Sequence, residues 1–359
     1  MTLTSPFTRF RILILLLCFL LILSVASSCA SVHATVLPTS TLVATVIPAA
    51  TETQTPTPTL SPTPTLVPAP TLSQAQRVCG GPSVMYILLV GSDTRFYNYD
   101  AGLADAIRLV RVDLTVPRVQ LLTFPRDLYV EIPGIKSHNG ITHGKLNQAY
   151  LYGNPGFGYY DGPGQGLGLL ALTMELNFGV HVDHYLAVNL KTFARFVDAL
   201  GGIDIRLPYE VDGRGKWNNP NRYYPYGYQH LDGYRTRLLA QMRPRGDVQR
   251  AQIQNLIMQA IAEKLLSPST LLRLPELSKA FTASIQTDLG PEEIGRLICL
   301  SSMLDKKNIE YVDFPSDLFK ESAVQDPILG YTFVWDVDFN VLKSYVQKFE
   351  DGTWPEAGK

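Results

Sequence analysis

The chain has 359 residues, 46% of them hydrophobic, and carries 31 basic against 32 acidic residues. This balance excludes a general nucleic-acid binder, because such a protein gains its affinity from a basic surface. The length is sufficient for one α/β domain with a sizeable core and for additional terminal segments.

The first 36 residues predict export across a membrane. Arg9 and Arg11 precede an uninterrupted apolar run at 12–26, and this positive flank places the amino terminus in the cytoplasm and everything after the run outside. A membrane span needs about 20 residues, so the run forms a signal anchor if the mild residues up to 36 are included. A lipoprotein signal ending at Cys29 and a cleaved signal peptide are the two alternatives.

Residues 37–81 predict an extracytoplasmic linker. Up to residue 72 the segment consists mostly of proline, threonine and small apolar residues, with Glu52 as its single charge. Proline removes backbone donors and favours extended geometry, so such a segment forms a semi-rigid spacer and no packed core. We expect it to hold the following domain, residues 82–350, away from the membrane.

From residue 84 onward, strand-like and helix-like patterns alternate. Three apolar strand-like runs occupy 84–95, 103–114 and 118–130. They are followed by a Gly-rich loop (158–168), a helix (169–178), a strand (181–190), a helix (191–202), a strand (203–207), a tyrosine-rich loop (209–230), a helix (247–266) and a strand (309–314). This alternation predicts an α/β fold in which helices flank both faces of a mixed central β-sheet. We divide the domain into a core, 84–266, and a C-terminal extension, 267–350.

Charged side chains gather at the ends of the first three strand-like runs. Asp93 lies just past the apolar part of the first run and Asp105 just before the apolar part of the second, while the third run contains Arg126 and Asp127. Neighbouring strands therefore deliver acids and a guanidinium to one place. Carboxylate oxygens suit a hard metal ion and a guanidinium suits a phosphate, so this cluster is the best candidate for a functional site.

The helix that opens at Asp247 carries a stripe of side chains spaced four, three and four residues apart. The stripe consists of Arg250, Gln254, Ile257 and Ile261. Because its later members are apolar and face the core, Arg250 and Gln254 should point inward as well. A buried arginine is costly unless it is paired, so either a carboxylate such as Asp247 meets it or it lines an anion-binding cavity. The nearby Arg243 and Arg245 favour the cavity.

Two of the four cysteines, Cys79 and Cys299, fall in the part of the chain that is expected to be exported. An oxidising exterior permits a disulfide between them, which would fix the start of the domain to a late helix. Two unpaired thiols are the alternative. No pair of cysteines has the spacing of a metal site.

Seven motifs in series resemble the LytR-CpsA-Psr family. They are GSDTR (91–95), the acid at Asp105, TFPRDLYV (123–130), HGKLNQAY (143–150), HVDHYLAVNLKTFARFVDALGGIDI (181–205), LDG (231–233) and DVQRAQIQ (247–254). Any one of them is a weak signal, but their order and spacing together are specific. The resemblance covers 84–266 densely and the C-terminal extension loosely.

The resemblance implies an enzyme of the bacterial cell envelope. Members of this family transfer a glycopolymer from a polyprenyl diphosphate carrier to peptidoglycan, and their polyprenyl tail lies in a hydrophobic tunnel. By this resemblance Mg²⁺ is the cofactor, Asp93 and Asp105 bind it, and Arg126 joins them in catalysis. The expected phosphate-binding residues are Arg126, Lys145, Arg243, Arg250 and Gln254, and the expected supporting residues are Asp127, Asn147 and Asp247.

The chain departs from the family pattern at three cationic positions. Leu103, Gln241 and Ile253 stand where the family usually has arginine. Each charge-assisted hydrogen bond contributes roughly 1.5 to 3 kcal/mol, so these changes remove much of the charge complementarity to a diphosphate. The arginines that are candidates to compensate are Arg95, Arg235, Arg237 and Arg245.

Two functions from other classes stay open on the sequence alone. A non-catalytic protein could bind the lipid or the glycan in the same pocket, which the missing arginines favour. A lipid diphosphatase could use the same metal and basic groups with water as the nucleophile. The tyrosine-rich segment 214–230 either stacks on sugar rings of the acceptor or packs on itself.

Overall fold

The computed structural model describes residues 79–355, apart from 95–98, 244–246, 266, 268–269, 271–284 and 302. The expected membrane segment and almost all of the expected linker, residues 1–78, lie outside the described residues. Within the described part of the chain, no helix has both the length and the apolar character that crossing a membrane requires.

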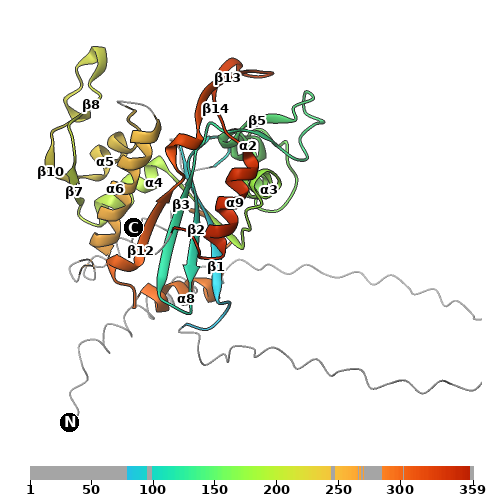
Figure 1. Cartoon of the computed structure of the whole chain (residues 1–359). Helices are drawn as coiled ribbons and strands as arrows, with labels where there is room; N and C mark the ends of the chain where they lie inside the picture. Colours follow the sequence, from blue (N-terminus) through green and yellow to red (C-terminus); the bar gives the residue numbers. More distant parts are fainter. Residues whose placement is uncertain are drawn as a thin grey trace, which may run out of the picture.

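A six-stranded sheet forms the centre of the molecule (Figure 1). Its strands are β1 (Val84–Ser92), β2 (Ala104–Asp113), β3 (Arg118–Phe124), β6 (His184–Asn189), β11 (Ile285–Thr287) and β12 (Ile309–Asp313), in the spatial order β11-β6-β1-β2-β3-β12. β1 pairs with β6 and β3 with β12 in parallel, while the other neighbours are antiparallel. The predicted mixed sheet is confirmed.

Helices cover both faces of this sheet, as predicted. One face carries α2 (Leu146–Gly153), α3 (Gln165–Phe178) and α9 (Phe339–Glu350), whose apolar side chains share one core with the sheet. The other face carries α4 (Leu190–Ala199), α6 (Asp247–Leu265) and α8 (Pro291–Ser301). Figure 1 shows α2, α3 and α9 on one side of the sheet and α4 and α6 on the other, with α8 below.

A second, smaller core lies beside α4 and α6. It is completed by α5 (Gly233–Ala240), β7 (Ile203–Leu207) and β10 (Gly227–Leu231), with β8 (Val211–Asp212) and β9 (Tyr223–Tyr224) forming a short ladder at its border. The loop predicted over 209–230 was therefore only partly right, because it contains these strands and the short helices η2 (Gly215–Trp217) and η3 (Pro220–Arg222). Strands of two residues are too short to show an alternating pattern.

The C-terminal extension is part of the main core. Leu342, Val346 and Phe349 of α9 are fully buried in the first cluster. Before α9, the strands β13 (Lys320–Asp326) and β14 (Gly330–Asp336) form an antiparallel hairpin. The small sheet of β4 (Tyr129–Glu131) and β5 (His143–Lys145) and the short helices η5 (Lys306–Asn308) and η6 (Ser316–Leu318) complete the described elements.

A disulfide joins Cys79 to Cys299 in α8, across 220 residues of sequence, with 5.8 Å between the two Cα atoms. Of the two alternatives that the sequence allowed, the bonded one is therefore confirmed. The bond fixes the start of β1 to the helix that covers the lower part of the sheet in Figure 1.

Candidate active site

The junction between β1 and β2 places two acids at the same end of the sheet. The ladder shifts register between Gly91 and Ser92, and beyond the shift the Asp93 N–H donates to the Leu103 carbonyl at 3.1 Å. The Leu103 N–H in turn donates to Asp93 Oδ1 at 2.7 Å. Gly102, just before, has a φ of +152°, and an added Cβ there would lie 2.7 Å from Ser92 Oγ. Only glycine allows the chain to pass this close to Asp93.

Asp105 lies between two arginines that come from different elements. Arg126, which follows β3, forms an ion pair with Asp105 Oδ1. Arg250 of α6 places its Nη2 3.3 Å from Asp105 Oδ2 and donates to the Asp105 carbonyl at 2.8 Å. The Arg250 side chain is 5% exposed and that of Asp105 is 22% exposed. One carboxylate therefore offsets the charge of two guanidinium groups while keeping access to solvent.

Arg250 both meets a carboxylate and lines a cavity. A carboxylate does meet Arg250, but it is Asp105 of the sheet; α6 begins at Asp247, whose side chain lies outside what the structure describes. Arg250 also lines a cavity, so the pairing and the cavity occur together.

Asp127 holds two cationic side chains in place. Its carboxylate accepts from Arg126 Nε at 3.1 Å and from Lys145 Nζ at 2.8 Å, and it is itself 4% exposed. The Asn147 N–H of α2 donates to the Arg126 carbonyl at 3.1 Å, and the Asn147 side chain is buried. The expected supporting residues Asp127 and Asn147 thus contact the turn that carries Arg126.

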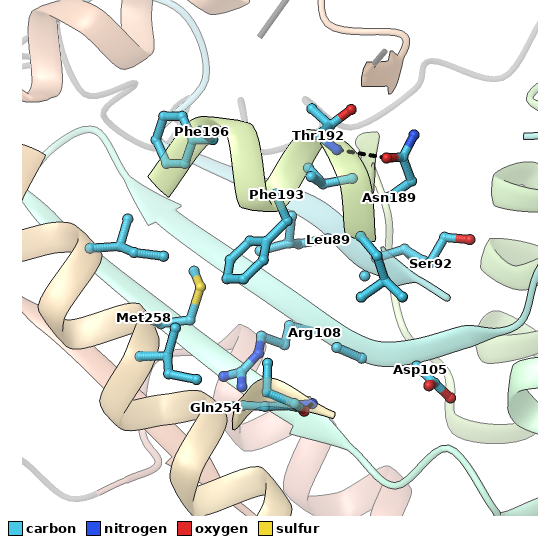
Figure 2. A pocket seen from close by; sticks show the side chains of 18 of the residues that line it. Leu89, Ser92, Asp105, Arg108, Asn189, Thr192, Phe193, Phe196, Gln254 and Met258 are labelled. Atoms are coloured by element: carbon cyan, nitrogen blue, oxygen red, sulfur yellow. Dashed lines mark hydrogen bonds between the residues drawn. The ribbon is translucent and has the colours of Figure 1, made fainter. Parts of the chain in front are cut away.

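An apolar cavity of about 330 Å³ adjoins this cluster, between β1, β2 and β6 of the sheet and the helices α4 and α6. Figure 2 shows Phe193 and Phe196 of α4 opposite Gln254 and Met258 of α6. Asn189 accepts from the Lys191 and Thr192 N–H groups at the start of α4, which fixes the helix over the cavity. The α6 stripe of Arg250, Gln254, Ile257 and Ile261 all faces this cavity. The apolar cavity expected beside the site is present.

A second cavity, of about 540 Å³, meets the first at four shared residues. The shared residues are Asp105, Ala106, Arg250 and Gln254. The second cavity is lined in addition by Arg126, by the acids Asp313 and Glu321, and by aromatic side chains that include Phe319 and Trp335. The charged cluster therefore lies where an apolar chamber and a more polar, aromatic chamber join. Such a place suits a substrate with an apolar half and a polar half.

The other residues singled out in the sequence differ in how close they lie to the cluster. Arg243 is exposed and lines neither cavity. Lys145 reaches the cluster only through Asp127. Of the three positions where arginine is missing, Gln241 lines the first cavity, whereas Ile253 is fully buried in the second core. Leu103 takes part through its backbone.

The arginines considered as substitutes are engaged elsewhere or fall outside the described residues. Arg235 donates to the Tyr223 carbonyl at 2.7 Å and its guanidinium lies over the Tyr224 ring. Arg237 lies over the Tyr234 ring and places Nη1 3.5 Å from Gln241 Oε1, at the border of the first cavity. Arg95 and Arg245 lie outside the described residues.

Sequence reasoning missed one residue of the first cavity, Arg108 of β2. It is 3% exposed, and its Nη1 donates to Asn255 Oδ1 of α6 at 2.5 Å. Burial lowers the pKa of its guanidinium, and the nearby Asp313 partly offsets this effect. The available signal was an arginine in the apolar interior of β2, on the same face of the strand as Ala106.

The donor set near Asp105 is compatible with Mg²⁺. Among the described residues, no three acidic, histidine or cysteine side chains come together as a metal cage. Mg²⁺ does not need one, because it is commonly held by one or two carboxylates together with phosphate oxygens and water. Asp105 is partly exposed where the two cavities meet, whereas Asp93, which bonds to Leu103, lines neither cavity. The Asp105 carboxylate therefore fits the ion as a partner of a bound phosphate, and the role of Asp93 stays a prediction.

The tyrosine-rich segment divides into a packed part and an exposed part. Tyr223 and Tyr224 lie under the guanidinium groups of Arg214 and Arg235. Tyr226 and Tyr228 are 63% and 81% exposed. The segment packs on itself in part, which leaves two rings open to solvent.

Comparison with known proteins gives one family. The family model described as the LytR_cpsA_psr family matches residues 71–338. The proteins named polyisoprenyl-teichoic acid–peptidoglycan teichoic acid transferase TagU are similar in sequence. The one from Bacillus mycoides is 28% identical over 211 residues, which cover 58% of this chain and 61% of that protein. The one from Oceanobacillus iheyensis is 30% identical, covering 59% and 61%, and one from Bacillus anthracis is 27% identical, covering 64% and 69%.

The fold is shared with several solved structures. The crystal structure of B. subtilis TagV has a TM-score of 0.56 and 21% identity, and the match covers 75% of this chain and 98% of that one. The structure described as TagT bound to LIIa-WTA has a TM-score of 0.56 and 20% identity, covering 77% and 95%. The match to the Bacillus mycoides relative spans about three fifths of that protein's length.

Proposed function

Because the chain belongs to the LytR-CpsA-Psr family, we propose that it transfers a glycopolymer from a polyprenyl diphosphate carrier to peptidoglycan. The observation that carries this proposal is the position of the Asp105, Arg126 and Arg250 cluster at the junction of two chambers. The names of the similar TagU proteins, which describe a transfer of teichoic acid to peptidoglycan, point to the same substrate classes.

The two chambers suit the two ends of such a donor. The apolar chamber between the sheet and α6 would take the polyprenyl tail, since its walls are mostly aliphatic and aromatic side chains. A flexible apolar chain gains about 25 cal/mol for each Å² that it buries there. The more polar chamber, with Arg126 and Trp335 in its walls, would take the sugars.

The cluster between the chambers would hold the diphosphate. Phosphoryl transfer depends on charge compensation and on alignment of the nucleophile with the leaving group. Arg126 and Arg250 offer guanidinium donors from two directions, and Asp127 keeps Arg126 and Lys145 from turning away. Asp93 and Asp105 would hold Mg²⁺, which when bound neutralises charge on the phosphates and polarises them.

We further propose that this domain works outside the cytoplasm of a bacterial cell, attached to the membrane by its amino-terminal segment or by a lipid on Cys29. The Cys79–Cys299 disulfide supports an oxidising compartment. The positive flank, the apolar run and the proline-rich linker in the sequence support attachment at a distance from the bilayer.

Product analysis tests the proposed reaction against hydrolysis. The full-length protein would be incubated with a lipid-diphosphate glycan, peptidoglycan and Mg²⁺, and peptidoglycan would be examined for glycan joined through a phosphodiester. We expect the linked product, and its loss in Arg126→Ala. Free glycan phosphate with no linked product would indicate a lipid diphosphatase, and unchanged donor would indicate a binding protein.

A further inference from the structure

A guanidinium lies in the wall of the apolar chamber. Arg108 stands three residues after Asp105 on β2 and lines the same cavity, although it is 3% exposed to solvent. Figure 2 shows it entering the chamber from the sheet, with Gln254 and Met258 of α6 on one side and Phe193 of α4 on the other. Because a strand rises about 3.3 Å per residue, Arg108 begins about 10 Å further along β2 than Asp105.

The protein satisfies this guanidinium only in part. Nη1 donates to the Asn255 amide oxygen at 2.5 Å, and the Asn255 Nδ2 donates to Asp313 Oδ2 at 2.8 Å. A neutral amide thus separates Arg108 from the carboxylate behind it. Nη2 is buried and has no hydrogen-bond partner among the residues that the structure describes.

A purely structural role explains this arrangement poorly. A buried donor without an acceptor costs free energy, and a buried charge costs more. An unbranched apolar side chain would fill the same wall without either cost. A buried cation in the wall of an apolar chamber is therefore better explained by an anion that enters the chamber.

We propose that Arg108 is a third phosphate-binding arginine, which contacts the phosphate that stays on the polyprenyl chain when the glycopolymer leaves. This identification of the ligand rests on the proposed function. Arg126 and Arg250 hold the charged cluster at the mouth, and Arg108 lies on the chamber side of it, where the lipid end of a diphosphate enters. It supplies a cation in the chamber whose wall has Gln241 at a position where the family usually has arginine.

The role is tested by separating recognition of the head group from recognition of the tail. Binding of geranylgeranyl monophosphate and of the uncharged geranylgeraniol to the full-length protein would be measured by titration calorimetry. The head-group selectivity is the dissociation constant of the alcohol divided by that of the monophosphate. Arg108→Met should lower this ratio at least tenfold and leave binding of the alcohol unchanged or tighter. Arg108→Lys should retain part of the selectivity that Arg108→Met loses, because lysine keeps the positive charge but lacks the paired N–H donors of the guanidinium.

Arg111→Met is the matched control. Arg111 lies on the same strand and is 8% exposed, but it faces the other side of the sheet, where it bonds to Gln120 and the Glu350 carbonyl. Its replacement should leave the head-group selectivity unchanged. Should Arg108→Met not fold, Arg108→Gln is expected to give the same loss of selectivity.

The outcomes separate this inference from the proposed function. If Arg108→Met and Arg108→Gln keep the wild-type selectivity for the phosphate, the role of Arg108 is overturned. The proposed use of a lipid carrier would be unaffected by that result. Equal binding of both probes to the wild type would also overturn the role of Arg108, since the chamber would then take a tail without recognising charge. Failure of the wild type to bind either probe would contradict the proposed function itself.

Discussion

At the scale of single residues, two carboxylates pair with three cationic side chains in the site. Asp105 is shared by Arg126 and Arg250, and Asp127 by Arg126 and Lys145. A phosphate that enters would therefore compete with Asp105 for two guanidinium groups. The same carboxylate keeps both arginines in position while the site is empty of substrate.

Asp105→Asn should abolish glycopolymer transfer and yet strengthen binding of a bare phosphate. The amide cannot offset two guanidinium charges, so inorganic pyrophosphate in the presence of EDTA should bind the variant roughly tenfold more tightly than the wild type, a gain of about 1 to 2 kcal/mol. Titration calorimetry measures this. The control is Asp113→Asn at the far end of the same strand, which should change neither property. Equal pyrophosphate affinity in Asp105→Asn and the wild type would contradict the shared-carboxylate account.

The missing arginines separate into two kinds once their positions are known. Gln241→Arg should strengthen the binding of a polyprenyl diphosphate, because this residue lines the chamber. The gain should be about 1 to 3 kcal/mol if the new guanidinium bonds to phosphate oxygens. Ile253→Arg should instead destabilise the protein by several kcal/mol, because this residue is fully buried in the second core. Thermal unfolding and ligand titration of both variants test the distinction, which fails if Ile253→Arg is as stable as the wild type.

At the scale of elements, the sequence predicted what the apolar patterns control. The three opening strands, the strand at β7 and the helix α6 were found because burial imposes a period of two or 3.6 residues on them. The α6 stripe also predicted the inward position of Arg250 and Gln254 correctly. The helices α2 and α5 and the β13–β14 hairpin were missed, since they are short or lie in the loosely matching extension.

The C-terminal end of α9 predicts a dependence of stability on pH. Burial raises the pKa of the Glu350 carboxyl, although the His181 N–H donates to it at 2.8 Å. The folded protein therefore binds this proton more tightly than the unfolded chain. The stabilising contribution is fully present below the usual pKa of about 4.3 and is lost as the pH rises through the raised value.

Glu350→Gln should consequently raise the thermal midpoint at pH 7 and have little effect near pH 4. The amide keeps an oxygen that can accept from the His181 N–H and removes the half-buried charge. Thermal unfolding followed across pH 4 to 8 measures the difference between variant and wild type. A difference that does not change with pH would show that the charge of Glu350 is not responsible.

At the scale of the whole molecule, the sequence was sufficient for the fold class and for the end of the sheet that carries the charged cluster. Strand ends with acids and arginine located the cluster because neighbouring strands bring their ends together. The sequence was not sufficient for the partners within it. That Asp105 is the acid shared by Arg126 and Arg250 depends on the crossing of α6 over the sheet, and the role of Arg108 depends on which face of β2 meets the chamber.

A crystal structure of the protein with geranylgeranyl diphosphate and Mg²⁺ tests the central claim most directly. The account predicts that the isoprenoid chain fills the chamber between β1, β2, β6, α4 and α6, and that the phosphates lie at its mouth against Arg126 and Arg250. Diphosphate bound away from these two arginines, or a chain that lies outside the chamber, would contradict it.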